Sequence, residues 1–257
     1  MYTLVQGARL RGSAGEPIPS VYPVLDERGL RFVRGQFCLF SAPPGAGKSP
    51  FALNLCLRSG VPAYYFSADS DAFTTRTRAI SMLSGSTMAD VEAAEIRGDD
   101  RLDKVVSGIP TRFNFDSALT FDSVERSLMA YDEVYGEYPG IIVVDNVTNI
   151  VADDDGYEKV MDFLHSLART TRAFVLGLHH VTGSYNNSDQ PIPLNGVRGQ
   201  LTAKPEVALT GYSYSDGLTT FLRVSIVKNR GGQADPSGQL CVDIPFDGAS
   251  MHFGGSR

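Results

Sequence analysis

The sequence has no excess of positive charge, few cysteines and no long hydrophobic run. Its 257 residues include 23 Lys and Arg against 29 Asp and Glu, a net charge of −6. This balance excludes a protein that coats nucleic acid or an anionic membrane with a broad basic face, but not one that holds nucleic acid with a few loops inside a ring. No uncharged apolar run approaches the ~20 residues that cross a bilayer, and residues 1–15 lack the apolar core of a signal peptide. We therefore expect a soluble, intracellular protein without a membrane partner.

The three cysteines are too few and too scattered for a disulfide framework. Cys38, Cys56 and Cys241 stand apart in apolar or strand-like segments, their number is odd, and no CxxC motif occurs. These features favour reduced thiols in the core over a metal site or a disulfide. With 42% hydrophobic and 20% charged residues, the chain has a globular composition. Its length is sufficient for one large domain that needs no disulfides.

The order of the hydrophobic patterns predicts an α/β fold. Strands are expected at 37–40, 63–66, 112–115, 141–144 and 173–178, and helices at 51–57, 74–83, 88–96, 121–135 and 157–169. Further strands at 207–214, 219–228 and 239–244 follow one another through turn sequences. We predict a mostly parallel sheet with helices on both faces and an antiparallel C-terminal β extension. Residues 1–21 are interpreted as an N-terminal arm or linker, and residues 22–257 as one domain.

A glycine-rich turn between the first predicted strand and helix has the pattern of a phosphate-binding loop. It reads Ala42-Pro43-Pro44-Gly45-Ala46-Gly47-Lys48-Ser49, which departs from GxxxxGK[ST] only by having Ala42 at the first glycine position. We expect this backbone to surround the phosphates of ATP, with Lys48 reaching the terminal phosphates and the Ser49 hydroxyl binding Mg²⁺. Pro50 removes an amide that would face the phosphates, so we expect it to lower nucleotide affinity.

Two acidic residues each come at the end of a predicted strand, where parallel sheets bind ligands. Asp145 follows the apolar run 141–144 and is a candidate to hold Mg²⁺ through water, the alternative being a cap of the next loop. Asp69 is a candidate to orient or deprotonate the attacking water. Asp71 lies close enough in the sequence to compete for this role, and Asp69 could instead be a solvated helix cap.

Two further pairs of polar residues lie at strand ends. His179 and His180 point to opposite faces of a strand, which disfavours a shared metal. We interpret His180 as a contact that senses the γ-phosphate, with a purely structural histidine pair as the alternative. Lys228 and Arg230 point to the same side of an extended chain and could either reach the phosphates of a neighbouring subunit or lie in a solvated turn.

Taken together, these motifs resemble the C-terminal motor domain of the DnaB-family replicative helicases, within the RecA-type ATPases. The similarity spans about 22–246. The residues that carry it are the stretch 42–54 (Walker A), Phe66-Ser67-Ala68-Asp69 with Asp for the family's Glu, the stretch 78–85, Val143-Val144-Asp145-Asn146 (Walker B), Leu178-His179-His180 with His180 at the sensor Gln, and Lys228-Asn229-Arg230 at the trans-acting finger.

The resemblance implies a hexameric, ATP- and Mg²⁺-dependent helicase on single-stranded DNA, acting in replication with a primase or loader in the cytoplasm of a bacterial or phage-infected cell. Lys48, Asp69 and His180 of one subunit and Lys228 and Arg230 of the next would be catalytic. The loop 182–200 would contact DNA through Arg198 and the backbone near Gly196 and Gly199, whereas Asp153, Asp154 and Asp155 would repel phosphates from the loop 151–156.

Some departures from the family leave other functions open. Only some twenty residues precede the similar region, so we expect a phage or prophage version without the family's N-terminal helical domain. Asp69 is one methylene shorter than the family's Glu, which could slow hydrolysis. One alternative is a RecA- or KaiC-like DNA-dependent ATPase in recombination or regulation, without strand separation. Another is a weakly hydrolysing, nucleotide-binding scaffold for replication proteins.

Overall fold

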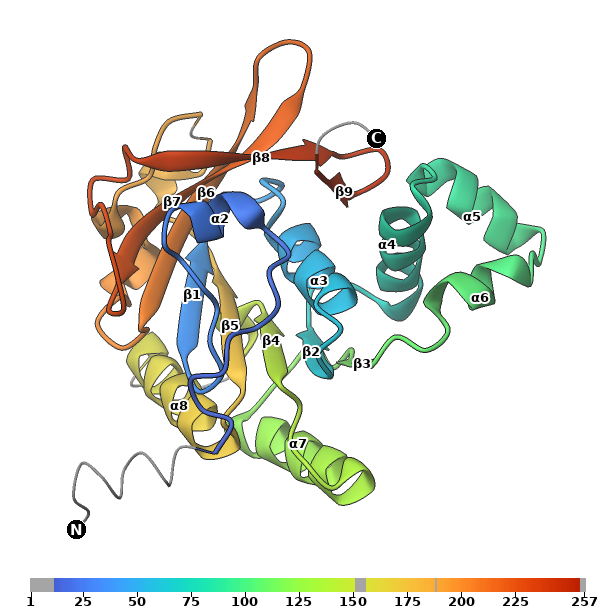
Figure 1. Cartoon of the computed structure of the whole chain (residues 1–257), viewed down its shortest axis with the longest axis horizontal. Helices are drawn as coiled ribbons and strands as arrows, with labels where there is room; N and C mark the ends of the chain where they lie inside the picture. Colours follow the sequence, from blue (N-terminus) through green and yellow to red (C-terminus); the bar gives the residue numbers. More distant parts are fainter. Residues whose placement is uncertain (1–11, 151–155, 188, 255–257) are drawn as a thin grey trace.

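A nine-stranded sheet forms the centre of the computed structural model, which describes residues 12–150, 156–187 and 189–254 (Figure 1). The strand order is β3-β2-β4-β5-β1-β6-β7-β8-β9. Strands β3 to β6 in this order are parallel to their neighbours, and β6 to β9 are antiparallel. The strands are β1 Phe37–Ser41, β2 Ala63–Ser67, β3 Thr111–Asn114, β4 Ile141–Asp145, β5 Phe174–His179, β6 Val207–Ser215, β7 Thr220–Asn229, β8 Cys241–Asp247 and β9 His252–Phe253.

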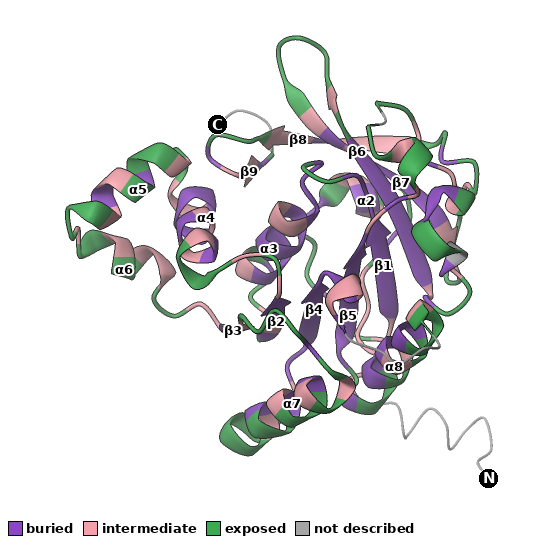
Figure 2. Cartoon of the chain, turned by 180° about the vertical axis from the view of Figure 1, so that it is seen from behind, coloured by how far each residue is buried: buried purple, intermediate pink, exposed green. Residues whose placement is uncertain are grey.

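Helices cover both faces of the parallel part of the sheet (Figure 2). The core on one face joins the strands to α3 (Lys48–Arg58) and the short α2 (Pro23–Glu27). The core on the other face joins them to α7 (Phe121–Tyr135) and α8 (Gly156–Thr171). Helix α8 buries its apolar residues at intervals of three and four, which is one face of a helix: Val160, Met161, Leu164, Leu167 and Ala168. None of the described helices is long and apolar enough to cross a membrane.

Three helices form a lobe beside the edge strand β3, to one side of the sheet in Figure 1. They are α4 (Ala72–Ser84), α5 (Met88–Ile96) and α6 (Arg101–Val106). Arg76 of α4 holds the lobe together, because its guanidinium donates to Glu95 of α5 at 2.6 Å and to Asp103 of α6 at 2.7 Å. Helix α6 was not predicted: it is six residues long and buries none of them, so its sequence has no apolar period to reveal it.

The predicted α/β class and its antiparallel extension are confirmed. Every predicted strand and helix is present, with ends that agree to within three residues. All three cysteines are free thiols, and Cys38 and Cys56 are buried, which raises the pKa of both. The sequence did not indicate four short 3₁₀ turns: Val147–Asn149, Gly183–Tyr185, Leu194–Gly196 and Arg198–Gln200.

The residues before β1 pack onto the domain where the structure describes them. Pro17 pairs with Val33, and Ile18 is buried. Tyr22 stacks on Phe51 of α3 with ring centroids 4.2 Å apart, and its hydroxyl donates to the Phe51 carbonyl at 2.7 Å. The Phe51 ring also meets Phe40 of β1 at 5.0 Å. These aromatic contacts fix α3, and hence the loop before it, against the sheet.

We expect Phe51→Ala to lower the free energy of unfolding by about 3–5 kcal/mol, because it empties a fully buried site between Tyr22 and Phe40. Phe51→Leu should cost less, since it leaves a smaller cavity. Phe73→Ala is the control: this ring is 51% exposed, and its loss should change stability by no more than about 0.5 kcal/mol. Urea unfolding followed by circular dichroism measures all three, and equal costs for the two alanine variants would contradict the assignment.

Candidate nucleotide-binding site

The glycine-rich loop joins the C-terminal end of β1 to the start of α3. Gly45 and Gly47 have φ of +76° and +100°, in the left-handed region that a residue with a Cβ disfavours. Ala42, at the position of the missing glycine, is buried and has no positive φ, so alanine fits there. Its amide donates to the His179 carbonyl at 3.3 Å, which ties the loop to β5. The positive end of α3 therefore opens onto the loop, an arrangement that binds phosphate.

Lys48 is the first residue of α3 and is buried, with 6% of its surface exposed. Its ammonium group donates to the carbonyls of Ala42 and Pro43, both at 2.9 Å. Burial lowers the pKa of Lys48 to about 8, although Asp145 and Asp69 act in the opposite direction. Lys48 is thus held inside the loop by the carbonyls of Ala42 and Pro43, near the carboxylates of Asp145 and Asp69. An anionic group bound beside the Lys48 ammonium would raise its pKa again.

Asp145 ends β4 in the interior of the site, and its carboxylate has one oxygen without a hydrogen-bond partner. The other oxygen, Oδ2, accepts from the Tyr65 hydroxyl at 2.8 Å. Burial raises the pKa of Asp145, the Ser49 and Tyr65 hydroxyls and Lys48 lower it, and Asp69 raises it. Asp145 and Ser49 line the same small hollow. A buried, partly unpartnered carboxylate oxygen beside a hydroxyl is a fitting place for a cation.

The donor set suits Mg²⁺. Among the described residues, no group of three His, Cys, Asp or Glu side chains converges to hold a metal. Mg²⁺ does not need one, because it keeps several waters and takes one or two protein oxygens together with phosphate oxygens of the substrate. Ser49 and Asp145 would hold the ion, and its chemistry there would be to neutralise phosphate charge.

Asp69 and Asp71 make different contacts. Asp71 is the N-cap of α4, and its carboxylate accepts from the backbone amide of Thr74 at 2.9 Å and from the Thr74 hydroxyl at 2.7 Å. It is therefore engaged in starting the helix. Asp69 is exposed, and its carboxylate accepts from the Asn146 side-chain amide, which follows Asp145. The sequence analysis did not single out Asn146 as the partner that holds Asp69 beside Asp145.

The two histidines differ in burial and contact. His179 is fully buried, and its Nε2 donates to the Arg198 carbonyl at 3.0 Å, which leaves Nδ1 without a partner. Burial lowers the pKa of His179 to about 4, so the ring is neutral at pH 7. His180 is half-buried, and burial, Lys48 and Arg198 lower its pKa while Asp69 raises it. His180 is therefore the more accessible of the two rings, and His179 holds the loop after the strand.

The loop 182–200 is attached to the end of β5. Arg198 donates its amide to the His180 carbonyl at 3.3 Å, and Val181 pairs with Val197. The Arg198 side chain is exposed, as expected for a DNA contact. Gly196 does not offer its amide: it is buried, its N–H donates to the Pro193 carbonyl at 2.8 Å, and a Cβ there would lie 2.7 Å from Ile192. Gly199 is exposed with φ of +73°.

The predicted loop 151–156 lies outside the described residues except for Gly156.

One aromatic residue near the phosphate loop was missed. A Cβ on Gly47 would lie 3.9 Å from the ring of Phe246 in β8. Phe246 also borders a cavity of about 620 Å³ that Phe221, Pro245 and His252 line. The Phe246 ring stacks on Phe253 of β9 with ring centroids 4.6 Å apart, so this aromatic pair lies beside the phosphate loop. Nothing local in the sequence signals it, because the contact joins strands that are distant along the chain.

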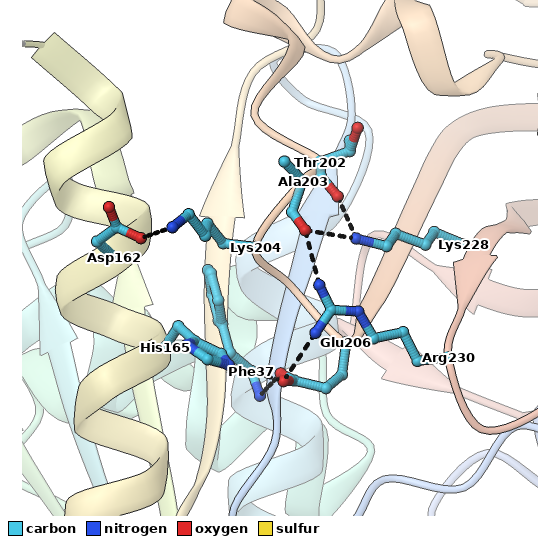
Figure 3. A network of polar contacts seen from close by, with 9 residues as sticks. All are labelled: Phe37, Asp162, His165, Thr202, Ala203, Lys204, Glu206, Lys228 and Arg230. Atoms are coloured by element: carbon cyan, nitrogen blue, oxygen red, sulfur yellow. Dashed lines mark hydrogen bonds and ion pairs between the residues drawn. The ribbon is translucent and has the colours of Figure 1, made fainter.

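Lys228 and Arg230 lie near the start of β1, whereas the phosphate loop follows the end of β1. The end of β7 pairs with the start of β6, since Asn229 lies opposite Val207, and Val207 pairs with Cys38 near the start of β1. The phosphate loop follows the other end of β1, about 13 Å away along the strand. Both cations donate to the Ala203 carbonyl, Lys228 at 2.9 Å and Arg230 at 2.8 Å (Figure 3). They are thus brought together, but away from Lys48 of their own chain.

We expect ADP binding at pH 8.5 to take up roughly three quarters of a proton, because Lys48, with a pKa of about 8, is mostly neutral at that pH until phosphate raises its pKa. At pH 6.5 Lys48 is already charged, so the uptake should vanish. Titration calorimetry in two buffers of different ionisation enthalpy measures the proton number. The control is Lys48→Arg, which carries its charge at both pH values and should show no uptake; equal uptake in this variant would contradict the assignment to Lys48.

Comparisons with known proteins agree with this geometry. No protein-family model matches the chain. It is similar in fold to a DnaB-like replicative helicase whose structure was described with its interactions with primase, with a TM-score of 0.79 and 17% identity over 97% of this chain; the chain spans 64% of that helicase chain. A separately solved ATPase domain gives a TM-score of 0.79 and 16% identity, over 99% of this chain and 96% of its own. A KaiC-like protein from Pyrococcus horikoshii gives 0.58 and 16%, over 93% and 98%.

Two phage proteins are similar in sequence. The gene 65 protein of Mycobacterium phage L5 is 46% identical over 263 aligned positions, which cover 98% of both chains. The gene 65 protein of Mycobacterium phage D29 is 45% identical over 84% of this chain and 97% of its own. The chain therefore belongs to the family of the mycobacteriophage gene 65 proteins, and it has the RecA-type fold of DnaB-like helicase ATPase domains.

Proposed function

We propose that the chain is an ATP-driven, ring-forming translocase on single-stranded DNA, of the replicative helicase type, that hydrolyses ATP between subunits. One observation carries the proposal. Lys48, Ser49 and Asp145 lie near the C-terminal end of β1, and Lys228 and Arg230 lie near its N-terminal end, on the opposite side of the sheet along the strand direction. A site that needs both sets is completed only by a second copy of the chain. A hexameric ring, with a primase or loader as replication partner, is the arrangement that the resemblance favours.

Within one half of the shared site, each residue has a distinct task. Lys48 places its charge against the terminal phosphates, and Ser49 and Asp145 hold Mg²⁺. Asp69, held by Asn146, orients the attacking water and accepts its proton. The water oxygen bonds to the γ-phosphorus while the bond from that phosphorus to the bridging oxygen breaks, and ADP leaves with the bridging oxygen. The neighbour's Lys228 and Arg230 stabilise the charge that develops on the transferred phosphoryl group.

The second part of the proposed activity is the binding of single-stranded DNA. The exposed Arg198 side chain follows a backbone that His179 and His180 hold through two hydrogen bonds. The Arg198 backbone is thus tied to the end of β5, the strand that lies beside the phosphate loop. In this proposal, a change at the phosphates would reach Arg198 through the end of β5.

A second candidate is a DNA-dependent ATPase that does not separate strands, since the fold is also similar to that of a KaiC-like protein, with a TM-score of 0.58. Strand displacement on a forked substrate distinguishes the two: a translocase displaces the annealed strand, whereas this second candidate hydrolyses ATP with single-stranded DNA and leaves the fork intact. A scaffold of low turnover would show neither activity.

The shared site predicts complementation between two inactive variants. Lys48→Ala removes the phosphate contact of one half, and Arg230→Ala removes the finger of the other, so each protein alone should hydrolyse ATP at less than about 1% of the wild-type rate. Mixed proteins should recover part of the activity, because some interfaces regain both intact halves. Steady-state ATPase against mixing ratio measures this.

The double variant with both substitutions, mixed with either single variant, is the control and should recover nothing. Subunit exchange is verified with a fluorescent label. Absence of recovery at every mixing ratio, with exchange demonstrated, would contradict a site shared between subunits.

Arg198→Ala should weaken binding to single-stranded DNA and reduce the slope of log Kd against log salt by about one phosphate contact, roughly 0.7. Arg126→Ala is the control, since Arg126 is an equally exposed arginine on α7, paired with Asp122 at 2.8 Å. Fluorescence anisotropy with a labelled oligonucleotide measures both variants. An Arg198→Ala protein with the wild-type salt slope would exclude this residue from the DNA contact.

A further inference from the structure

Glu206 lies at the junction of the segment before β6, the start of β1 and the end of β7 (Figure 3). Its side chain is only 18% exposed. The sequence analysis gave this residue no role. The structure brings three partners from separate parts of the chain to this partly buried carboxylate: two hydrogen-bond donors and one cation.

The first two donors fix the carboxylate itself. The Phe37 amide of β1 donates to Oε2 at 3.0 Å. His165 of α8 donates from Nε2 to Oε1 at 2.9 Å, because a carboxylate oxygen only accepts. Both donors belong to regular elements of the core, so the position of the carboxylate is set by the sheet and by α8 rather than by a surface loop.

The third partner is Arg230, which forms an ion pair with Glu206. Its Nη1 lies 3.5 Å from Glu206 Oε1, and its Nη2 donates to the Ala203 carbonyl at 2.8 Å. The backbone is fixed by the same residue, because the Arg230 amide donates to the Glu206 carbonyl and the Glu206 amide to the Phe37 carbonyl, both at 2.9 Å. Glu206 therefore anchors the main chain and the side chain of Arg230 to the start of β1.

An arginine without such an anchor is poorly positioned to contact phosphates that a neighbouring subunit binds. Its long side chain has many rotamers, and this conformational freedom is lost when the side chain is fixed on a transition state. The Arg230 side chain is still 51% exposed, so one side of the guanidinium is held by Glu206 and Ala203 while the rest is open to a ligand. The same Ala203 carbonyl accepts from Lys228, which keeps the two cations side by side.

We propose that Glu206 is the positioning residue of the trans-acting pair, and that it fixes Arg230 for the phosphates bound by the neighbouring copy. The proposal rests on the shared site proposed above. Glu206 itself touches neither nucleotide nor DNA. Its effect is confined to the half of the site that its own subunit contributes to the neighbour, and this restriction is what an experiment can detect.

The test uses the full chain with Glu206→Ala and Glu206→Gln. Alone, Glu206→Ala should lower the ATPase rate at least tenfold. Gln keeps an oxygen that accepts from the Phe37 amide but lacks the charge that faces Arg230, so Glu206→Gln should fall between Glu206→Ala and wild type. Both variants should bind a fluorescent ATP analogue as tightly as the wild type, because the phosphate loop lies at the other end of β1.

Complementation identifies the half-site. Mixed with Lys48→Ala, which has an intact finger half, each Glu206 variant should regain activity to the level of the Arg230→Ala and Lys48→Ala mixture. Mixed with Arg230→Ala, it should regain none, since both proteins are defective in the same half. A residue needed only for folding or for its own phosphate loop would not be rescued by Lys48→Ala.

Asp162→Ala is the matched control, because this carboxylate pairs with Lys204 at 2.5 Å near the same edge of the sheet but does not contact Arg230. It should alter the rate by less than twofold. If Glu206→Ala does not fold, Glu206→Gln alone decides the question.

A wild-type rate in Glu206→Gln, recovery with Arg230→Ala, or no recovery with Lys48→Ala would each overturn the proposal for Glu206. If Lys48→Ala and Arg230→Ala fail to complement each other, the shared site is wrong and the role of Glu206 falls with it. Failure confined to the Glu206 mixtures leaves the shared site intact.

Discussion

Strand β1 constrains the positions of two groups of candidate site residues. The phosphate loop follows its C-terminal end, and Lys228 and Arg230 lie near its start. Its parallel pairing with β5 brings Ser41 beside His179, so that the phosphate loop begins next to the end of β5. Its parallel pairing with β6 brings Cys38 beside Val207, and through β6 it fixes the end of β7. Because β1 is short and fully buried, the two groups of functional residues are held at a fixed separation along one rigid strand.

Burial explains how a chain of net negative charge forms a candidate site for an anion. The chain carries a net charge of −6, and the buried Lys48 is the first residue of α3, whose positive end opens onto the loop. Lys48 is desolvated among carbonyl groups and lies near Asp145 and Asp69, so its protonation responds to the phosphates. A buried site of this kind recognises an anion by position and hydrogen bonding, without the long-range attraction of a basic surface.

The sequence was sufficient to locate the candidate site residues that follow a recognisable strand. The phosphate loop, Asp145 and Asp69 each follow an apolar strand, and the parallel topology places the ends of these strands together. That Asp71 caps α4 required the structure, since a cap and a catalytic acid have the same sequence pattern until the Thr74 contacts are seen. The placement of the site residues is thus described by the structure, whereas their roles in catalysis and DNA binding stay predictions.

Residues whose contacts join distant parts of the chain could not be identified from the sequence. Phe246 is next to Gly47 only because the antiparallel strands fold back over the phosphate loop. Glu206 stands in a Pro-Glu-Val stretch that has no motif, and its partners come from β1, α8 and the end of β7. Periodicity reports which face of an element is buried, but it carries no information about which residues of other elements meet there.

The segment between Arg198 and Glu206 connects the two edges of the sheet in one further way. At one end, His179 holds the Arg198 carbonyl beside the nucleotide edge; at the other, Ala203 and Glu206 hold Lys228 and Arg230. Leu201 is buried between these ends and Lys204 pairs with Asp162 of α8, so the segment is attached along its length rather than free. Only seven residues lie between Arg198 and Glu206. The end of β5 therefore has a short, packed connection to Lys228 and Arg230 at the end of β7.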